Sequence, residues 1–173
     1  MMKATARAAC VFASFALVAL SPDARAQVNP NDKVLDFDTM FGIQAPFLRA
    51  AFPFCGVLGA GAPWSIDRGT GVLRANGDVD IHVRRLVLTN TGVNPVATFG
   101  ARVCCVTVDA AGAAAEVTRD VVNDANTPPN QFPATPTGDS RIRGTVELPT
   151  PCLGPVIFVT NGGTGAWFAV TGR

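Results

Sequence analysis

Short segments in which apolar and polar residues alternate recur along most of the sequence, and glycine or proline ends nearly every one of them. A period of two places successive side chains on opposite faces of a β-strand. The 17 glycines and 13 prolines among 173 residues keep such strands short and disfavour long helices. The hydrophobic fraction of 48% against a charged fraction of 16% excludes a disordered polyelectrolyte. We therefore predict an all-β fold.

Nine segments are predicted as strands, most of them because they alternate. The segment at residues 101–109 is instead apolar on both faces, which predicts a strand in the middle of a sheet. Asn76-Gly77 lies between two of the predicted strands and is the strongest short-range signal for a hairpin turn. Because almost no amphipathic helical pattern accompanies the strands, two antiparallel sheets packed face to face are expected. The prediction is a single-domain antiparallel β-sandwich, immunoglobulin-like or jelly-roll-like, with about eight or nine strands. The predicted strands span residues 34–38, 64–67, 71–75, 78–88, 101–109, 115–122, 141–148, 155–160 and 166–171.

Residues 1–26 have the features of a secretory signal peptide. Lys3 and Arg7 precede an apolar run at residues 8–20, and Ala24-Arg25-Ala26 offers small residues for cleavage. As a helix this run would extend about 20 Å, which is short of the roughly 30 Å hydrocarbon core of a bilayer. We expect cleavage after Ala26 and export of residues 27–173, the predicted β-sandwich domain, to the periplasm or the medium without a transmembrane anchor.

The charge of the chain gives no sign of a nucleic-acid partner. The formal net charge of the whole sequence is +1, and without the leader eleven basic and twelve acidic residues remain. A domain that binds nucleic acid carries a clear basic excess on one face. We therefore expect no nucleic-acid partner.

The mature chain retains four of the five cysteines, because Cys10 lies in the leader. An even number of cysteines in an oxidising compartment predicts two disulfides. A bridge between the adjacent Cys104 and Cys105 would be strained, since their side chains point to opposite faces of a strand. Two pairings remain, and of these we favour Cys105 with Cys152 and Cys55 with Cys104. Without a CxxC pair, and with one distant histidine, no metal site or cofactor is expected.

The two ends of the mature chain carry a recognisable pattern. DFDTMFG stands at residues 36–42, and PCLGPVIFVT at residues 151–160 is followed by GAWFAVTG at residues 165–172. These segments resemble the ends of small exported bacterial proteins that have no assigned function. The resemblance implies an exported single-domain protein, and it implies no catalytic or binding residues.

One predicted strand carries a row of polar side chains. Asp78, Asp80, His82 and Arg84 share one face of the segment at residues 78–88, about 6.6–7 Å apart, while apolar residues share the other. The apolar phase changes after Arg84, which predicts a β-bulge or a handover of the strand from one sheet to the other. We interpret the row as a solvated face of balanced charges, with a polar face for a partner as its functional alternative.

Two chemical roles remain open for the acidic residues. His82 is the only histidine, so a small secreted hydrolase or carbohydrate-active domain would use Asp80 and His82, or the acidic pairs, as acid and base. A calcium-stabilised binding module would instead take its oxygen ligands from Asp36 and Asp38, or from Asn76 with Asp78 and Asp80. Neither stretch matches an EF-hand loop.

Two segments lack a strand pattern. Residues 39–63 are apolar but irregular, and we interpret them as a core lid with a helical turn near residues 47–51. The phenylalanines of residues 41–54 would otherwise form an exposed patch for self-association. Residues 123–139 contain four prolines and are predicted as a long surface loop. The function that fits best is a non-enzymatic exported interaction or structural module of the cell envelope or medium, with an unknown protein or envelope partner.

Overall fold

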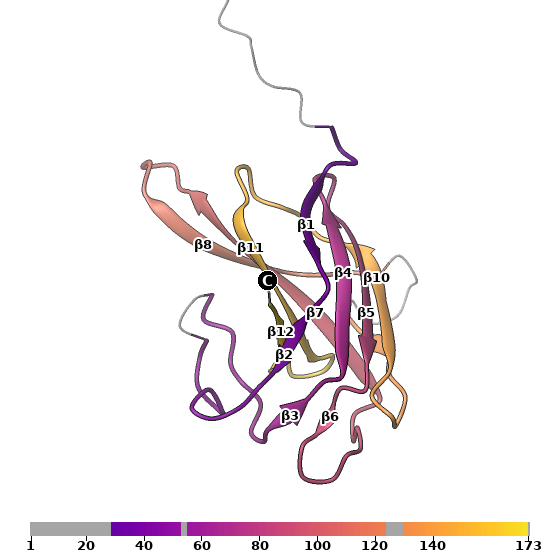
Figure 1. The fold of residues 1–173 in the computed structure, drawn as a ribbon. Coiled ribbons are helices and arrows are strands. Elements are labelled where there is room, and N and C mark those ends of the chain that lie inside the picture. The colour runs from indigo at the N-terminus through magenta and orange to yellow at the C-terminus, as the bar shows by residue number, and fades with distance from the viewer. Residues whose placement is uncertain (1–28, 53–54, 124–129, 173) are drawn as a thin grey trace, which may run out of the picture.

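The computed structural model of the protein describes residues 29–52, 55–123 and 130–172. Within these ranges the chain forms twelve β-strands and no helix, which confirms the all-β prediction with more strands than the eight or nine expected. The strands pack as a β-sandwich (Figure 1). Their bounds are β1 Lys33–Phe37, β2 Met40–Gly42, β3 Trp64–Ser65, β4 Arg68–Arg74, β5 Asp78–Arg84, β6 Val87–Leu88, β7 Thr98–Val108, β8 Ala114–Asp120, β9 Phe132–Pro133, β10 Ser140–Thr145, β11 Leu153–Asn161 and β12 Trp167–Thr171.

The first sheet has four antiparallel strands in the order β1-β4-β5-β10. Its centre is the β4–β5 hairpin, which turns at Asn76-Gly77 as the sequence predicts. The Gly77 amide donates a 2.9 Å hydrogen bond to the carbonyl of Arg74, and Gly77 has φ of +90°, a region that favours glycine. β10 returns from the far end of the chain to pair with β5 along six residues.

The second sheet has the order β2-β12-β11-β7-β8, and β9 also pairs with β7. The eleven-residue β7 lies between β11 and β8, as its apolar character on both faces predicts. Two strands were not predicted. β2 lies in the segment interpreted as irregular, and β9 lies in the predicted proline-rich loop, of which residues 124–129 are outside the described residues. Both are only two or three residues long, too short for alternation to reveal.

The break between β5 and β6 explains the change of apolar phase after Arg84. Arg85 adopts φ of +52° and Leu86 then turns inward to full burial. The Leu86 amide donates to the Gly138 carbonyl at 2.9 Å, whereas β6 pairs with β3 in a separate two-stranded sheet. The handover between sheets, which was one of the two predicted solutions, is the one observed.

The main core lies between the two large sheets and is centred on aromatic rings. Trp64 stacks on Phe168 with ring centroids 3.9 Å apart, and Phe99 packs edge-on against both rings. All three side chains are buried, as are Ile81 and Ile157 from the facing sheets. This core is therefore continuous across both sheets.

The same core extends beneath the segment that joins β2 to β3. Phe52 packs 5.1 Å from Phe158 and 5.5 Å from Trp167, and Phe47 lies 6.3 Å from Trp167. The segment forms hydrogen-bonded turns at residues 44–50 instead of the predicted helical turn. It acts as a lid on the second sheet. Phe41 alone among these phenylalanines is exposed, at 65%, and Phe54 lies outside the described residues.

Two disulfides secure β7 on both of its faces. Cys104 is joined to Cys55 of the lid, and Cys105 is joined to Cys152 just before β11. This is the pairing favoured from the sequence. The adjacent cysteines reach different partners because alternate residues of a strand face opposite ways. Two disulfides are compatible with an oxidising location outside the cytoplasm. In the described part of the chain no helix has the length and apolar character needed to cross a membrane.

Candidate functional site: the charged face of the four-stranded sheet

The alternating sequence of β5 determines which of its side chains reach solvent. Val79, Ile81 and Val83 are at most 2% exposed and face the core. The residues between them point to the outer surface of the sheet, and burial of the apolar set fixes this register, because a slip by one residue would expose it. The polar row comprises Asp78, Asp80, His82 and Arg84, and it shares one face as predicted.

Neighbouring strands place further polar residues beside this row. On β10, Arg143 lies opposite Asp80 and Arg141 lies opposite His82. On β4, Arg68 lies opposite Arg84 in the antiparallel register. The outer surface of β1, β4, β5 and β10 therefore carries a dense set of charges, which we call the charged face. It consists of Lys33, Asp36, Asp38, Arg68, Thr70, Val72, Arg74, Asp78, Asp80, His82, Arg84, Arg141, Arg143 and Thr145.

Asp80 is the electrostatic centre of this face. Arg141 donates to both of its carboxylate oxygens, from Nε at 3.0 Å and from Nη2 at 2.8 Å. Arg143 adds a third bond from Nη2 at 2.8 Å, and His82 Nε2 lies 3.5 Å from Oδ1. The hydrogen bonds from Arg141 are the largest cause that lowers the pKa of Asp80 from 3.8 to about 2. Asp80 is thus a fixed anion near neutral pH.

Two of the other acidic residues proposed as calcium ligands, Asp36 and Asp78, have protein partners of their own. Lys33 Nζ lies 2.6 Å from Asp36. Asn76 donates from Nδ2 to Asp78 at 2.7 Å and accepts from the Asp78 amide at 3.0 Å, an arrangement that stabilises the hairpin turn. Among the described residues no group of three or more His, Cys, Asp or Glu side chains gathers as metal ligands. The calcium alternative therefore gains no support from this geometry.

Four open grooves cross or border the charged face, with volumes of about 330, 640, 530 and 440 Å³. Each is lined by at least two residues of that face. His82 borders two of them, and its side chain is 53% exposed. The grooves are broad depressions on a sheet, and they suit a ligand that lies across the surface better than a small molecule that must be enclosed.

The basic end of the charged face lies where β5 turns away towards β6. Arg68 and Arg84 are cross-strand partners here. Asp139 lies in the adjoining loop, and a hydrogen bond from the Thr137 hydroxyl is the largest cause that lowers its pKa, with the Arg85 amide contributing. Through these hydrogen bonds Asp139 links the loop to the end of β5.

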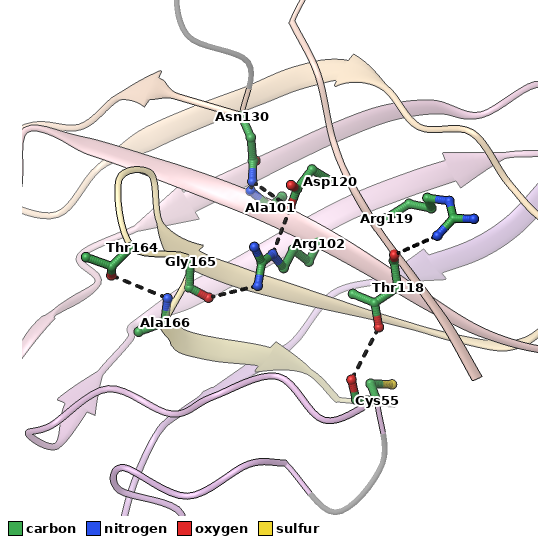
Figure 2. A network of polar contacts seen from close by, with 10 residues as sticks. All are labelled: Cys55, Ala101, Arg102, Thr118, Arg119, Asp120, Asn130, Thr164, Gly165 and Ala166. Atoms are coloured by element: carbon green, nitrogen blue, oxygen red, sulfur yellow. Dashed lines mark hydrogen bonds and ion pairs between the residues drawn. The ribbon is translucent and has the colours of Figure 1, made fainter. Parts of the chain in front are cut away.

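A separate polar network lies on the second sheet (Figure 2). Arg102 Nε donates to Asp120 Oδ1 at 2.7 Å, and Asn130 Nδ2 donates to the same oxygen at 3.1 Å. The buried Asn130 also accepts from the Ala101 amide at 2.6 Å. Because each of these polar atoms has a partner within the fold, the network anchors residue 130 against β7 and has a structural role.

Comparison with known proteins gives no further information on these arrangements. No protein-family model, curated protein or solved structure matches the chain. The resemblance of its two ends to small exported bacterial proteins stays a prediction.

The row on β5 is evident in the sequence, but the residues that complete the site are not. Arg141 and Arg143 belong to a strand predicted at residues 141–148, and their alternation with Ile142 and Gly144 was the available signal. What the sequence does not contain is the pairing of that strand with β5. Arg141 follows Asp80 by 61 positions in the sequence, so only the folded sheet brings them together.

Proposed function

We propose that the protein is an exported, non-enzymatic β-sandwich that serves as an interaction or structural module of the cell envelope or medium, with the charged face as the surface that meets its partner. The proposal places the exposed arginines and His82 at the contact. Charges arranged on a sheet surface of this kind contribute more to the specificity and the rate of association than to the affinity.

The state of Asp80 is the observation that carries the proposal. A general acid or base works best when its pKa lies near the working pH, and burial usually raises the pKa of such a carboxyl. In Asp80 two guanidinium groups lower the pKa to about 2 instead. Its charge is suited to fixing the arginine side chains in place for binding, which disfavours the alternative of a hydrolase that uses Asp80 and His82.

Export is supported by two independent features. The leader at residues 1–26 has the composition of a signal peptide, although its structure lies outside the described residues. The two disulfides use all four cysteines of the mature chain and would persist only where reduction is slow. Location in the periplasm or in the medium follows as part of the proposal.

The proposal is tested by sedimentation of the oxidised mature chain with envelope fragments isolated from the producing cells. We expect the wild type to bind and the double variant Arg141→Gln/Arg143→Gln to bind at least about tenfold more weakly, which corresponds to roughly 1.4 kcal/mol. Arg49→Gln/Arg119→Gln is the matched control, because it removes the same charge from exposed positions outside the charged face.

Two results would count against this function. Equal binding by both double variants would show that the charged face is not the contact surface. Release of soluble products from the envelope fragments by the wild type, lost in Asp80→Asn and His82→Gln, would establish the hydrolase alternative. Circular dichroism of each variant verifies that the sandwich remains folded.

A further inference from the structure

Two arginines face one another at the basic end of the charged face. Arg68 is the first residue of β4 and Arg84 is the last residue of β5, and the antiparallel register places them directly opposite. Side chains at such positions have their Cβ atoms about 4.5–5.5 Å apart, so like charges there repel. Both side chains belong to exposed residues. A sheet that carries such a pair is stabilised when an anion lies between the two guanidinium groups.

The closest contacts of the neighbouring carboxylates are with other groups, although Asp139 also interacts with Arg84 through its charge. Asp67 lies 3.6 Å from Arg85. Asp139 accepts from the Arg85 amide at 3.1 Å and from the Thr137 hydroxyl at 2.7 Å. Among the residues that the structure describes, no ion pair joins a carboxylate to Arg68 or Arg84 within 4.0 Å. Their donors are therefore available to a ligand.

Two adjoining grooves connect this arginine pair with the rest of the face. The larger, about 640 Å³, contains Arg68, Arg84 and Arg85 together with Asp67 and Asp139. The other, about 530 Å³, contains His82, Arg84 and Arg141 together with Asp139. Since Arg84 lines both grooves and the basic side chains outnumber the carboxylates in each, we treat them as one continuous path, which we call the basic track.

We propose that the basic track binds a carboxylate-bearing polysaccharide. This inference rests on the proposed function and names the chemistry of the partner. Each guanidinium offers a planar fork that matches a carboxylate with two parallel hydrogen bonds. A linear acidic polysaccharide presents such groups repeatedly, and one of them engages the arginine pair, whereas the fork of Arg141 already binds Asp80.

The composition of the track favours a polysaccharide over an acidic peptide. The two grooves are lined by charged, hydroxyl and small residues, with Val83 and Pro133 as the only apolar members of the set and no Phe or Trp. Peptide grooves usually contain pockets for apolar side chains, whereas an acidic sugar chain is polar along its whole length. Without an aromatic ring for stacking on a sugar, recognition depends on the carboxylates.

The test measures binding of polygalacturonate to the oxidised mature chain by calorimetry at low ionic strength. We expect saturable binding that weakens as salt is added, since screening reduces interactions between exposed charges. Arg68→Gln/Arg84→Gln should weaken it at least tenfold, and Arg68→Lys/Arg84→Lys should give an intermediate loss because lysine keeps the charge without the fork. Arg49→Gln/Arg119→Gln, the matched control, should bind like the wild type, and neutral dextran should not bind.

Three results would overturn the inference. The first is that the wild type does not bind polygalacturonate. The second is that Arg68→Gln/Arg84→Gln and the control lose the same amount of affinity. The third is that poly-glutamate binds as tightly as polygalacturonate. If envelope fragments are bound through Arg141 and Arg143 while polygalacturonate is not, the ligand class is wrong and the proposed function stands. If neither is bound, both fail.

Discussion

Each disulfide should contribute a large share of the free energy of unfolding of the protein. The bridge from Cys55 to Cys104 spans 49 residues of sequence, and the bridge from Cys105 to Cys152 spans 47. In the chain-entropy description, closing a loop of this length lowers the entropy of the unfolded chain by about 14 cal/mol/K, or about 4 kcal/mol at 25 °C. Each bridge should therefore stabilise the native state by about that amount.

The two loops do not overlap, because one ends at residue 104 and the other begins at residue 105. Their contributions to the free energy of unfolding should add, to about 8 kcal/mol. Domains of ordinary stability have unfolding free energies of about 5–15 kcal/mol. A domain in the lower part of that range would be marginal or unfolded once both bridges are reduced, and one at the upper end would lose about half of its stability.

Urea unfolding of three variants checks this reasoning. Cys55→Ala/Cys104→Ala and Cys105→Ala/Cys152→Ala should each lose about 4 kcal/mol of unfolding free energy, and the quadruple variant should lose about the sum. Treatment of the wild type with dithiothreitol should reproduce the quadruple variant. A loss below about 1 kcal/mol from either pair would refute the loop argument, as would free thiols in the oxidised protein.

Three further predictions test the packing and the charges. Asp80→Asn should make the free energy of unfolding less dependent on pH in the acid range. The pKa of Asp80 is lowered from 3.8 to about 2 in the folded state, so the ionised carboxylate contributes fully to stability above pH 3.8, and this contribution is lost as the pH falls towards 2. Solvent screening limits it to about 1 kcal/mol, and an unchanged pH profile of thermal unfolding would contradict this. Gly138→Ala should destabilise more than Gly112→Ala in urea, because both have φ near +80° but only at Gly138 would a Cβ meet the backbone of residue 86; equal losses would contradict the packing. Phe52→Ala should lower the free energy of unfolding by about 2 kcal/mol, because it removes packing beneath the lid. Phe41→Ser should change that free energy by less than about 0.5 kcal/mol. If the wild type forms a concentration-dependent dimer, Phe41→Ser should be monomeric in sedimentation velocity, and a dimer that survives the substitution would rule out association through Phe41.

Local patterns, alternation in most strands and apolar residues on both faces of β7, were enough to predict most of the strands that build the main core. Val79, Ile81 and Val83 reveal the buried face of β5, and the dipeptide Asn76-Gly77 reveals its turn, because both signals are local in sequence. The break at Arg85 was visible as a change of phase. Its form was not, since the partner that receives Leu86 is the Gly138 carbonyl, more than fifty residues away.

The parts that escaped prediction depend on long-range pairing. β2 and β9 have two or three residues each and acquire their conformation from β12 and β7. The lid segment reads as irregular because its order comes from Phe52 on Phe158 and from the bridge at Cys55. In the same way, the polar row of β5 was evident, whereas the capture of Asp80 by Arg141 and Arg143 required the register of β10.

His82 offers the most direct test of the charged face. It is the only histidine in the chain, and its side chain is 53% exposed at the middle of that face. Diethyl pyrocarbonate modifies accessible imidazole groups, so the rate of His82 modification can be followed by mass spectrometry with and without bound envelope fragments. We predict that the bound protein is modified several-fold more slowly. An unchanged rate in protein that has sedimented with the fragments would contradict the assignment of this face as the contact surface.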